Sequence, residues 1–294
     1  NSGRQSYSMQ DILDTVPAAV SLFETNATGG SASTQRVGAG NATGSGSTVG
    51  GGQNNISSGP RSSIVGGLNN TSSNTNSTVA GGRDNTSSGY NSIVGGGSGN
   101  NASGFYSFLG AGRNNNASNT HSFLGGGFSN TASGDYSFIG GGQSNESSGS
   151  RSFLGGGSGN IVSGTASFLG GGFSNTASNT NSFIGGGQNN SALNNNATVV
   201  GGRNNTSSGY ASIVVGGLNN TSSGYYSFIG GGYGNIASGD QSSVGMGYGN
   251  TASGSHSTVS GGQNNNGSGA RSFIGGGTGN TSSAYYSFLG GGSS

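Results

Sequence analysis

The chain has 294 residues, of which 28% are hydrophobic and 68 are glycine, and its formal net charge is only +1. This composition excludes a conventional globular core, and the absence of cysteine excludes a disulfide framework. With no basic stripe and no apolar run of membrane-spanning length, we expect neither a nucleic-acid partner nor a membrane span.

The first 46 residues lie outside the pattern that fills the rest of the chain. Their most apolar run extends from Tyr7 to Phe23 and is divided by Pro17. We expect residues 1–46 to be a capping segment for the first coil, since the ends of repeat arrays need covers. The alternative is a docking segment. The repeat stops within a coil at Ser294, so a strand edge there would accept a second copy and produce a head-to-tail filament.

Residues 47–294 repeat one fifteen-residue unit in about sixteen copies without an insertion, as in Ser137–Arg151 and Ser227–Gln241. A constant period of this kind is typical of a stacked solenoid, in which one coil cannot bury its own apolar side alone. We therefore predict an all-β fold, a parallel β-solenoid (β-roll or β-helix) with about sixteen coils. Each coil should hold two short strands, one around Ser-Phe-Ile and one around Asn-Thr-Ala-Ser.

The positions of the unit are called columns one to fifteen, counted from the serine before Phe-Ile. Column three is aliphatic in every copy, from Val49 to Leu289, which predicts an inward ladder. Column eleven holds small residues, as at Ala132, and should face the aliphatic ladder. Column six is always glycine and column thirteen is nearly always glycine or asparagine. At column six we expect a turn with positive φ or a close backbone approach. At column thirteen we expect a second turn, where both residue types accept a left-handed conformation.

Column nine is asparagine in every complete copy. Stacked carboxamides can bond to the coils above and below, which predicts a structural ladder or turn role. N-glycosylation is the rival interpretation, but most of these asparagines lack the Asn-X-Ser/Thr sequon. The predicted ladder consists of Asn55, Asn70, Asn85, Asn100, Asn115, Asn130, Asn145, Asn160, Asn175, Asn190, Asn205, Asn220, Asn235, Asn250, Asn265 and Asn280.

Sequons elsewhere in the chain are candidates for N-glycosylation, although a sequence rich in Asn, Ser and Thr contains many by chance. The candidates are Asn26, Asn41, Asn69, Asn76, Asn101, Asn116, Asn189, Asn196, Asn204, Asn219 and Asn266.

Column two contains phenylalanine in nine copies. If column three points inward, strand alternation sends column two outward. Six consecutive outward phenylalanines would exceed the apolar patch of an ordinary monomer, so we expect an oligomer interface. The alternative is a flattened coil in which columns two and three both touch apolar material. The phenylalanines are Phe108, Phe123, Phe138, Phe153, Phe168, Phe183, Phe228, Phe273 and Phe288.

No set of residues points to catalysis. His121 and His256 are nine coils apart, the acidic residues are scattered, and the glycine runs lack the lysine of a phosphate loop. We expect no enzyme activity, no metal and no cofactor. Threonines in column ten suggest a minor alternative, an ice-binding surface, but Ile56 and Glu146 interrupt the row.

The Ser-Phe-Ile-Gly-Gly and Asn-Thr-Ala-Ser-Gly blocks resemble the head repeats of trimeric autotransporter adhesins, and also Gly/Ser/Asn-rich arrays in tail-fibre-like proteins. The resemblance covers residues 47–294 and rests on Ser137, Ile139, Gly140, Asn145, Gly149 and their equivalents. It implies a left-handed parallel β-roll, trimers packed through an apolar face, and surface display. Phenylalanine in column two and the lack of a coiled-coil stalk or anchor depart from it.

The expected function is a structural subunit of a fibre, located outside the cell or on a cell or virion surface. Its partners would be other copies of itself, as a trimer or a head-to-tail filament, together with attached glycans. The alternative is an adhesin or receptor-binding head that uses aromatic residues in the variable columns seven, fourteen and fifteen.

Overall fold

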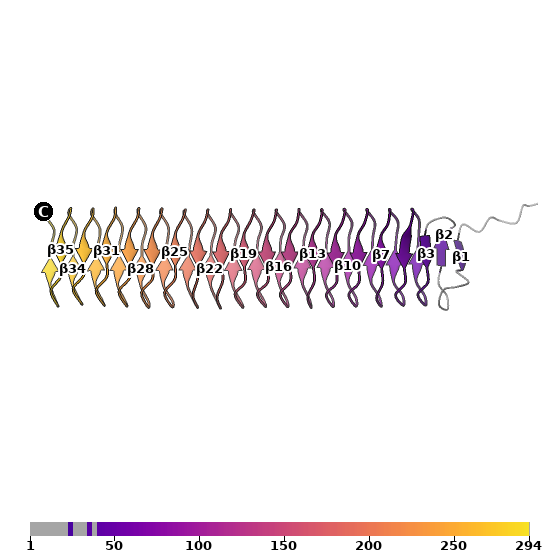
Figure 1. Cartoon of the computed structure of the whole chain (residues 1–294), viewed down its shortest axis with the longest axis horizontal. Coiled ribbons are helices and arrows are strands. Elements are labelled where there is room, and N and C mark those ends of the chain that lie inside the picture. The colour runs from indigo at the N-terminus through magenta and orange to yellow at the C-terminus, as the bar shows by residue number, and fades with distance from the viewer. Residues whose placement is uncertain (1–22, 26–33, 37–39, 294) are drawn as a thin grey trace, which may run out of the picture.

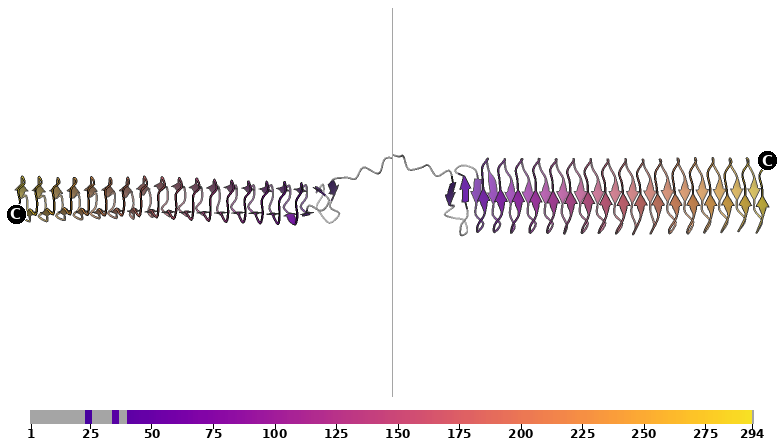
Figure 2. Two further views of the ribbon diagram at one scale, coloured as in Figure 1. Left: turned by 90° about the horizontal axis from the view of Figure 1, so that it is seen from above. Right: turned by 180° about the vertical axis from the view of Figure 1, so that it is seen from behind.

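The computed structural model describes residues 23–25, 34–36 and 40–293. These residues contain only strands, turns and bends, and they form a straight stack of coils with the C-terminal coil at one end (Figure 1). Viewed from above, the strands lie in two layers that are joined within each coil (Figure 2). The structure confirms the predicted all-β parallel β-solenoid with two strands per coil.

The first layer, sheet A, contains 19 strands. They are β1 (Phe23–Thr25), β2 (Thr34–Arg36), β4 (Thr48–Val49), β6 (Ser63–Ile64), β8 (Thr78–Val79), β10 (Ile93–Val94), β12 (Phe108–Leu109), β14 (Phe123–Leu124), β16 (Phe138–Ile139), β18 (Phe153–Leu154), β20 (Phe168–Leu169), β22 (Phe183–Ile184), β24 (Thr198–Val199), β26 (Ile213–Val214), β28 (Phe228–Ile229), β30 (Ser243–Val244), β32 (Thr258–Val259), β34 (Phe273–Ile274) and β36 (Phe288–Leu289).

The second layer, sheet B, contains the remaining strands. They are β3 (Gly40–Ala42), β5 (Asn55–Ser57), β7 (Thr71–Ser72), β9 (Thr86–Ser87), β11 (Asn101–Ala102), β13 (Asn116–Ala117), β15 (Thr131–Ala132), β17 (Glu146–Ser147), β19 (Ile161–Val162), β21 (Thr176–Ala177), β23 (Ser191–Ala192), β25 (Thr206–Ser207), β27 (Thr221–Ser222), β29 (Ile236–Ala237), β31 (Thr251–Ala252), β33 (Asn266–Gly267) and β35 (Thr281–Ser282).

Every repeat strand pairs in parallel with the equivalent strand of the next coil, so identical columns lie beside one another. Phe138 pairs with Phe153, for example, and Thr131 pairs with Glu146. Column seven adds a third ladder of isolated parallel bridges, beginning with Gln53 and Leu68. The two-strand coil therefore has a third, single-residue contact that the sequence pattern did not reveal.

The regular stacking begins upstream of Ser47. β3 pairs in parallel with β5, and β2 pairs in parallel with β4 through Thr34 and Thr48. β1 pairs with β2 in the antiparallel direction, so the polarity of sheet A changes at this end. The apolar run that starts at Tyr7 lies outside the described residues apart from Phe23, which opens β1.

The core is a thin double row of side chains between the sheets. Column three is fully buried from Val49 to Ile274, and Leu289 packs against its end. Column eleven, with residues such as Ala132 and Val162, is buried opposite it. Both inward columns were predicted correctly, because strand alternation in a two-layer solenoid leaves room for one large and one small residue per coil.

The serines of column one are also buried from Ser47 to Ser272, and their hydrogen bonds depend on column eleven. Where column eleven is serine the two hydroxyls bond, as between Ser87 and Ser92 at 2.7 Å. Where it is alanine or glycine, the column-one Oγ is mostly left without a hydrogen-bond partner. The unpartnered hydroxyls within residues 40–293 are those of Ser47, Ser107, Ser122, Ser137, Ser242, Ser257 and Ser272.

The turns confirm one prediction and correct another. Column six has φ between 86° and 134° in every coil, and a Cβ on Gly52 would lie 2.0 Å from the Gly67 oxygen. Column thirteen begins the predicted second turn, but it does not have positive φ, so the left-handed conformation expected there is wrong. Glycine there lets the backbones of consecutive coils approach closely, since a Cβ on Gly59 would lie 2.2 Å from the Asn74 backbone oxygen.

The left-handed residues of the second turn are in column fifteen, and a further set lies in column eight. Column fifteen includes Arg61 at φ 55° and Ala166 at φ 54°, and column eight includes Asn54 at φ 56°. In the second turn the column-one amide donates to the column-thirteen carbonyl, as from Ser62 to Gly59 at 3.1 Å. A single positive φ at the third residue is the feature of a type II turn.

Candidate functional site

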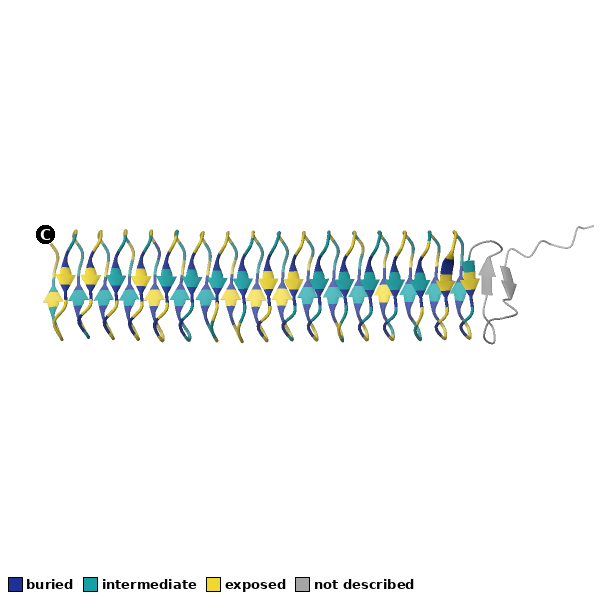
Figure 3. Cartoon of the chain, viewed as in Figure 1, coloured by how far each residue is buried: buried dark blue, intermediate teal, exposed yellow. Residues whose placement is uncertain are grey.

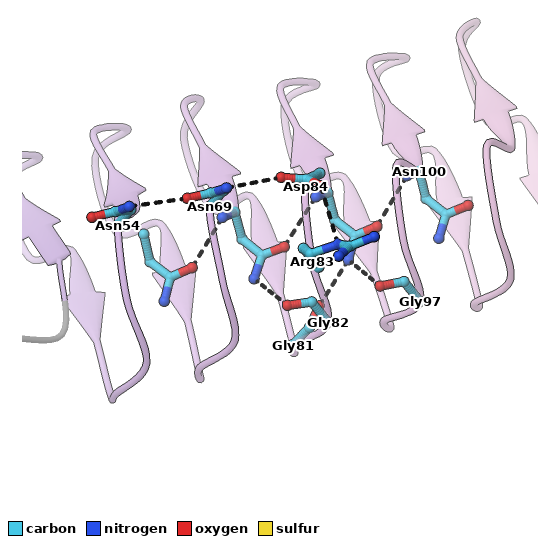
Figure 4. Close-up of polar contacts among 11 residues, drawn as sticks. Asn54, Asn69, Gly81, Gly82, Arg83, Asp84, Gly97 and Asn100 are labelled. Carbon is cyan, nitrogen blue, oxygen red and sulfur yellow. Dashed lines mark hydrogen bonds and ion pairs between the residues drawn. The ribbon is translucent and has the colours of Figure 1, made fainter.

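The column-nine asparagines line the interior beside the glycine corner. All sixteen are buried, the most accessible being Asn280 at 7%. Asn85 represents the set. Its Nδ2 donates to the Gly81 carbonyl of its own coil at 2.9 Å and to the Gly97 carbonyl of the next coil at 3.0 Å. Its Oδ1 accepts the backbone N–H of Asn100 at 3.0 Å. Figure 4 labels these two glycines and Asn100.

This arrangement makes each asparagine a bridge between consecutive coils. The bond from one Oδ1 to the next asparagine N–H recurs along the whole ladder, as at Asn70 and Asn145. Direct amide-to-amide bonds occur in some coils only, as from Asn115 to Asn100 at 3.2 Å. The ladder thus connects side chains mainly to backbone. It donates to the column-five carbonyls and gives the column-six carbonyls a second donor, since these also accept the column-seven N–H, as from Arg83 to Gly97 at 2.9 Å.

Columns six and nine depend on each other. A Cβ on Gly67 would lie 2.5 Å from the Asn70 Nδ2, and one on Gly82 would lie 2.6 Å from the Asn85 Nδ2. The glycine column therefore supplies the space that the amide occupies. This explains why both columns are invariant along the array.

The candidate glycosylation sites fall into different environments. The column-eight residues Asn69, Asn189, Asn204 and Asn219 are exposed on a turn. The column-ten residues Asn41 and Asn266 are exposed and lie on the outer side of sheet B. The remaining described candidates Asn76, Asn101, Asn116 and Asn196 are half-buried, and Asn26 lies outside the described residues.

The phenylalanines of column two lie on the outer side of sheet A, as strand alternation predicted. Five consecutive ring pairs stack between Phe108 and Phe183, with centroids 4.8 to 5.2 Å apart. Phe228 is 38% exposed, and Phe288 in the last coil is 74% exposed. Phe273 and Phe288 form another stacked pair at 5.1 Å.

Each ring also lies over the glycine two residues later. The Phe138 Cε1 is 3.6 Å from where a Cβ on Gly140 would stand, and Phe153 has the same relation to Gly155. Every column-two phenylalanine in the sequence is followed by glycine at column four. The constant Phe-X-Gly spacing is the sequence signal for this partnership.

From β4 onward, the outer face of sheet A carries no charged residue. From Ser47 onward, columns one to six contain no Asp, Glu, Arg or His in any coil. The charged residues of the repeats stand in other columns, among them Arg83 and Asp84, whose ion pair measures 3.3 Å. We call the surface formed by columns two and four the neutral face. Figure 3 shows half-buried and exposed strand residues following one another along both layers.

Aromatic residues also gather along the turn of columns fourteen and fifteen. His121 stacks between Tyr106 and Tyr136, with centroids 5.0 and 4.6 Å away. Phe105 is 57% exposed beside them. These side chains form an exposed row of rings at one edge of the rod.

Two tyrosines on the same edge, Tyr225 and Tyr286, have a shifted pKa. A hydrogen bond with Tyr226 raises the pKa of Tyr225 above the usual tyrosine value. A hydrogen bond with Tyr285 lowers the pKa of Tyr286, and the Arg271 guanidinium, which donates to the Tyr286 hydroxyl, lowers it further.

The outer side of sheet B carries the threonines of column ten and the serines of column twelve. Thr131 and Thr176 are half-buried there, while Ile56, Glu146 and Ile161 are exposed and interrupt the row. The hydroxyl array is therefore divided into short stretches.

Among residues 40–293 and the two short strands before them, no group of three or more His, Cys, Asp or Glu side chains could hold a metal ion. In the same residues no helix is long and apolar enough to cross a bilayer. No family model matches the chain, and no curated protein is detectably similar to it in sequence.

Proposed function

We propose that the chain is a non-enzymatic structural subunit of an extracellular or surface fibre, whose copies pack through the neutral face. The observation that carries this proposal is the combination of a stacked phenylalanine row with a complete absence of charge across columns one to six. The depletion of charged residues and the enrichment of aromatic residues are typical of the cores of protein interfaces.

The size of the neutral face fits a specific contact. Sixteen steps between coils at about 4.8 Å each give a length of roughly 77 Å, and columns two to four give a width of roughly 10 Å. The resulting area of about 800 Å² matches what each partner contributes to a standard protein interface. Because every copy has the same fifteen-residue period, two rods can keep their coils in step along this length.

The resemblance to trimeric autotransporter heads favours a trimer, since those heads pack through an apolar face. In such a trimer the neutral faces would meet along a common axis. The turns of column eight and of columns fourteen and fifteen would then remain accessible. This geometry is part of the proposal.

The test replaces three stacked rings by threonine, as F138T, F153T and F168T in one chain. Threonine already occupies this column at Thr78 and Thr198, so the fold tolerates it. We expect the variant to stay folded by circular dichroism and to sediment as a smaller species than the wild type at equal concentration. An unchanged sedimentation profile would count against packing through this face.

The matched control alters the opposite side of the rod. The variant T131E and T176E places charge in column ten, where Glu146 already stands. We expect its sedimentation profile to equal that of the wild type. If the control lost assembly and the threonine variant did not, the interface would lie on the outer side of sheet B.

The second candidate function is an adhesin or receptor-binding head, favoured by the exposed ring row around Tyr106, His121 and Tyr136. Replacing Tyr106 and Tyr136 by asparagine, which suits a left-handed turn, would remove the rings without strain. Loss of binding to a target surface with unchanged assembly would support this candidate. The ice-binding alternative predicts thermal hysteresis, and the interrupted threonine row leads us to expect none.

The head-to-tail contact expected from residues 1–46 stays a prediction. Deleting residues 1–23 and measuring fibre length by electron microscopy tests it. Shorter fibres are expected if the segment docks on another copy, whereas unchanged length would leave it with a capping role.

A further inference from the structure

The fold places the N-glycosylation sequons of columns eight and nine in opposite environments, although they are neighbours in the sequence. Seven sequons begin at a buried column-nine asparagine, namely Asn55, Asn70, Asn85, Asn145, Asn205, Asn220 and Asn280. Four begin one residue earlier, at the exposed column-eight residues Asn69, Asn189, Asn204 and Asn219.

Column-nine amides cannot carry a glycan in the folded chain. The Asn70 Nδ2, which would become the attachment atom, donates to the Gly66 carbonyl at 3.1 Å and to the Gly82 carbonyl at 3.0 Å. The backbone of Gly67 closes the remaining space beside it. A sugar on this nitrogen would break both hydrogen bonds and would need room between the two sheets.

The column-eight asparagine side chains, in contrast, are exposed to solvent. Asn69, Asn189, Asn204 and Asn219 have φ between 52° and 59°, which turns their side chains to the outside of the coil. Their contacts are surface bonds between neighbours, such as Asn204 Nδ2 to Asn219 Oδ1 at 2.9 Å and Asn69 Nδ2 to Asp84 Oδ1 at 3.1 Å. Exposed bonds of this kind contribute little to stability, so a glycan can replace them.

We propose that Asn69, Asn189, Asn204 and Asn219 are N-glycan acceptor sites and that the column-nine sequons are not. Asparagine never occurs in columns one to six, so none of these sugars would cover the neutral face. Glycans at column eight would form a row on one turn of the rod. This arrangement follows from the coil geometry and does not depend on the proposed fibre role.

Three coils contain overlapping sequons and provide an internal test. In Asn69-Asn70-Thr71-Ser72 both asparagines begin a sequon, and the same holds at Asn204 and Asn219. The full chain is secreted from a cell line with eukaryotic N-glycosylation, and the soluble, protease-resistant fraction is treated with peptide-N-glycosidase in heavy-oxygen water. Peptide mass spectrometry then reads the labelled aspartate at each former glycan site.

The expected result is label at the four column-eight residues and none at Asn70, Asn205 or Asn220. Label at any column-nine residue of this fraction would overturn the proposal, as would its absence from all four column-eight residues. Chains that acquire a column-nine glycan during synthesis cannot close the coil, so they should be found only in the insoluble fraction.

Two single variants separate the overlapping sequons. Thr71→Val removes the sequon of Asn69 and keeps that of Asn70, and isoleucine in this column elsewhere shows that a β-branched apolar residue is tolerated. Ser72→Ala removes the sequon of Asn70 and keeps that of Asn69. We expect Thr71→Val to lose the glycan from this peptide and Ser72→Ala to retain it. The reverse pattern would overturn the assignment.

Discussion

Truncating one asparagine of the buried ladder should destabilise the protein far more than changing its sequence neighbour. Asn114, Asn115 and Asn116 are consecutive, but only Asn115 is inside the coil. Its Nδ2 donates to the Ala111 carbonyl at 3.2 Å and the Gly127 carbonyl at 2.9 Å, and its Oδ1 accepts the Asn130 N–H at 3.0 Å.

The magnitude follows from these three bonds. Each contributes about 1 kcal/mol net, so Asn115→Ala should lower the free energy of unfolding by at least about 3 kcal/mol. The loss can exceed this sum, because the buried Asn130 N–H loses its acceptor. The Gly127 carbonyl keeps one donor, the Arg113 N–H at 2.9 Å. The control Asn116→Thr introduces the commonest residue of column ten on the outer side and should stay within about 0.5 kcal/mol of the wild type.

Urea unfolding followed by far-UV circular dichroism measures the global loss, and amide hydrogen exchange locates it. Since neighbouring coils interact mainly with one another, the Asn130 N–H should lose protection before amides in distant coils. Equal unfolding free energies for Asn115→Ala and Asn116→Thr would refute the structural role of the ladder.

Three further predictions concern the interior and the turns. Asn115→Asp keeps an acceptor but removes both donors, and burial should raise the pKa of the new carboxyl. The variant should therefore be least stable at neutral pH, and its stability should recover as the pH falls and the acid becomes neutral. Urea unfolding at several pH values measures this dependence. Ser122→Ala removes an unpartnered buried hydroxyl and should leave the free energy of unfolding unchanged or raise it by about 1 kcal/mol. Ser92→Ala breaks the hydrogen bond to Ser87 and should lower it by about 1 kcal/mol, so losses of the same size in both variants would contradict this. Ala166→Gly removes the strain of a positive φ at alanine and should raise the melting temperature by the equivalent of about 1 kcal/mol. Ala177→Gly, in the buried column eleven, should lower the melting temperature. A decrease for Ala166→Gly would contradict the turn assignment.

The interior of the coil could be predicted from the sequence because its residue types are restricted. An aliphatic at column three in every copy, from Val49 onward, has no explanation on a solvated surface. Invariant glycine at column six likewise indicated a special backbone conformation. Asn85 and its equivalents were predicted as a ladder, but the bonds to glycine carbonyls require the shape of the corner.

The turns were harder to predict, for two different reasons. Column eight holds only Asn, Asp, Ser and Gly, all tolerant of short left-handed turns, so this signal was present and was missed. Column fifteen holds residues as different as Arg61, Tyr106 and Ala166, so no residue type marks it. Its positive φ is held by hydrogen bonds between coils, such as Arg61 N–H to the Ser45 carbonyl at 2.8 Å.

A cryo-electron microscopy map of the assembled protein tests the central claim, that copies pack through the neutral face, most directly. If copies pack through the neutral face, the rings from Phe108 to Phe183 are buried between chains and the column-eight turns face solvent. A map in which these phenylalanines face solvent, with contacts made through sheet B or the turns, would contradict it.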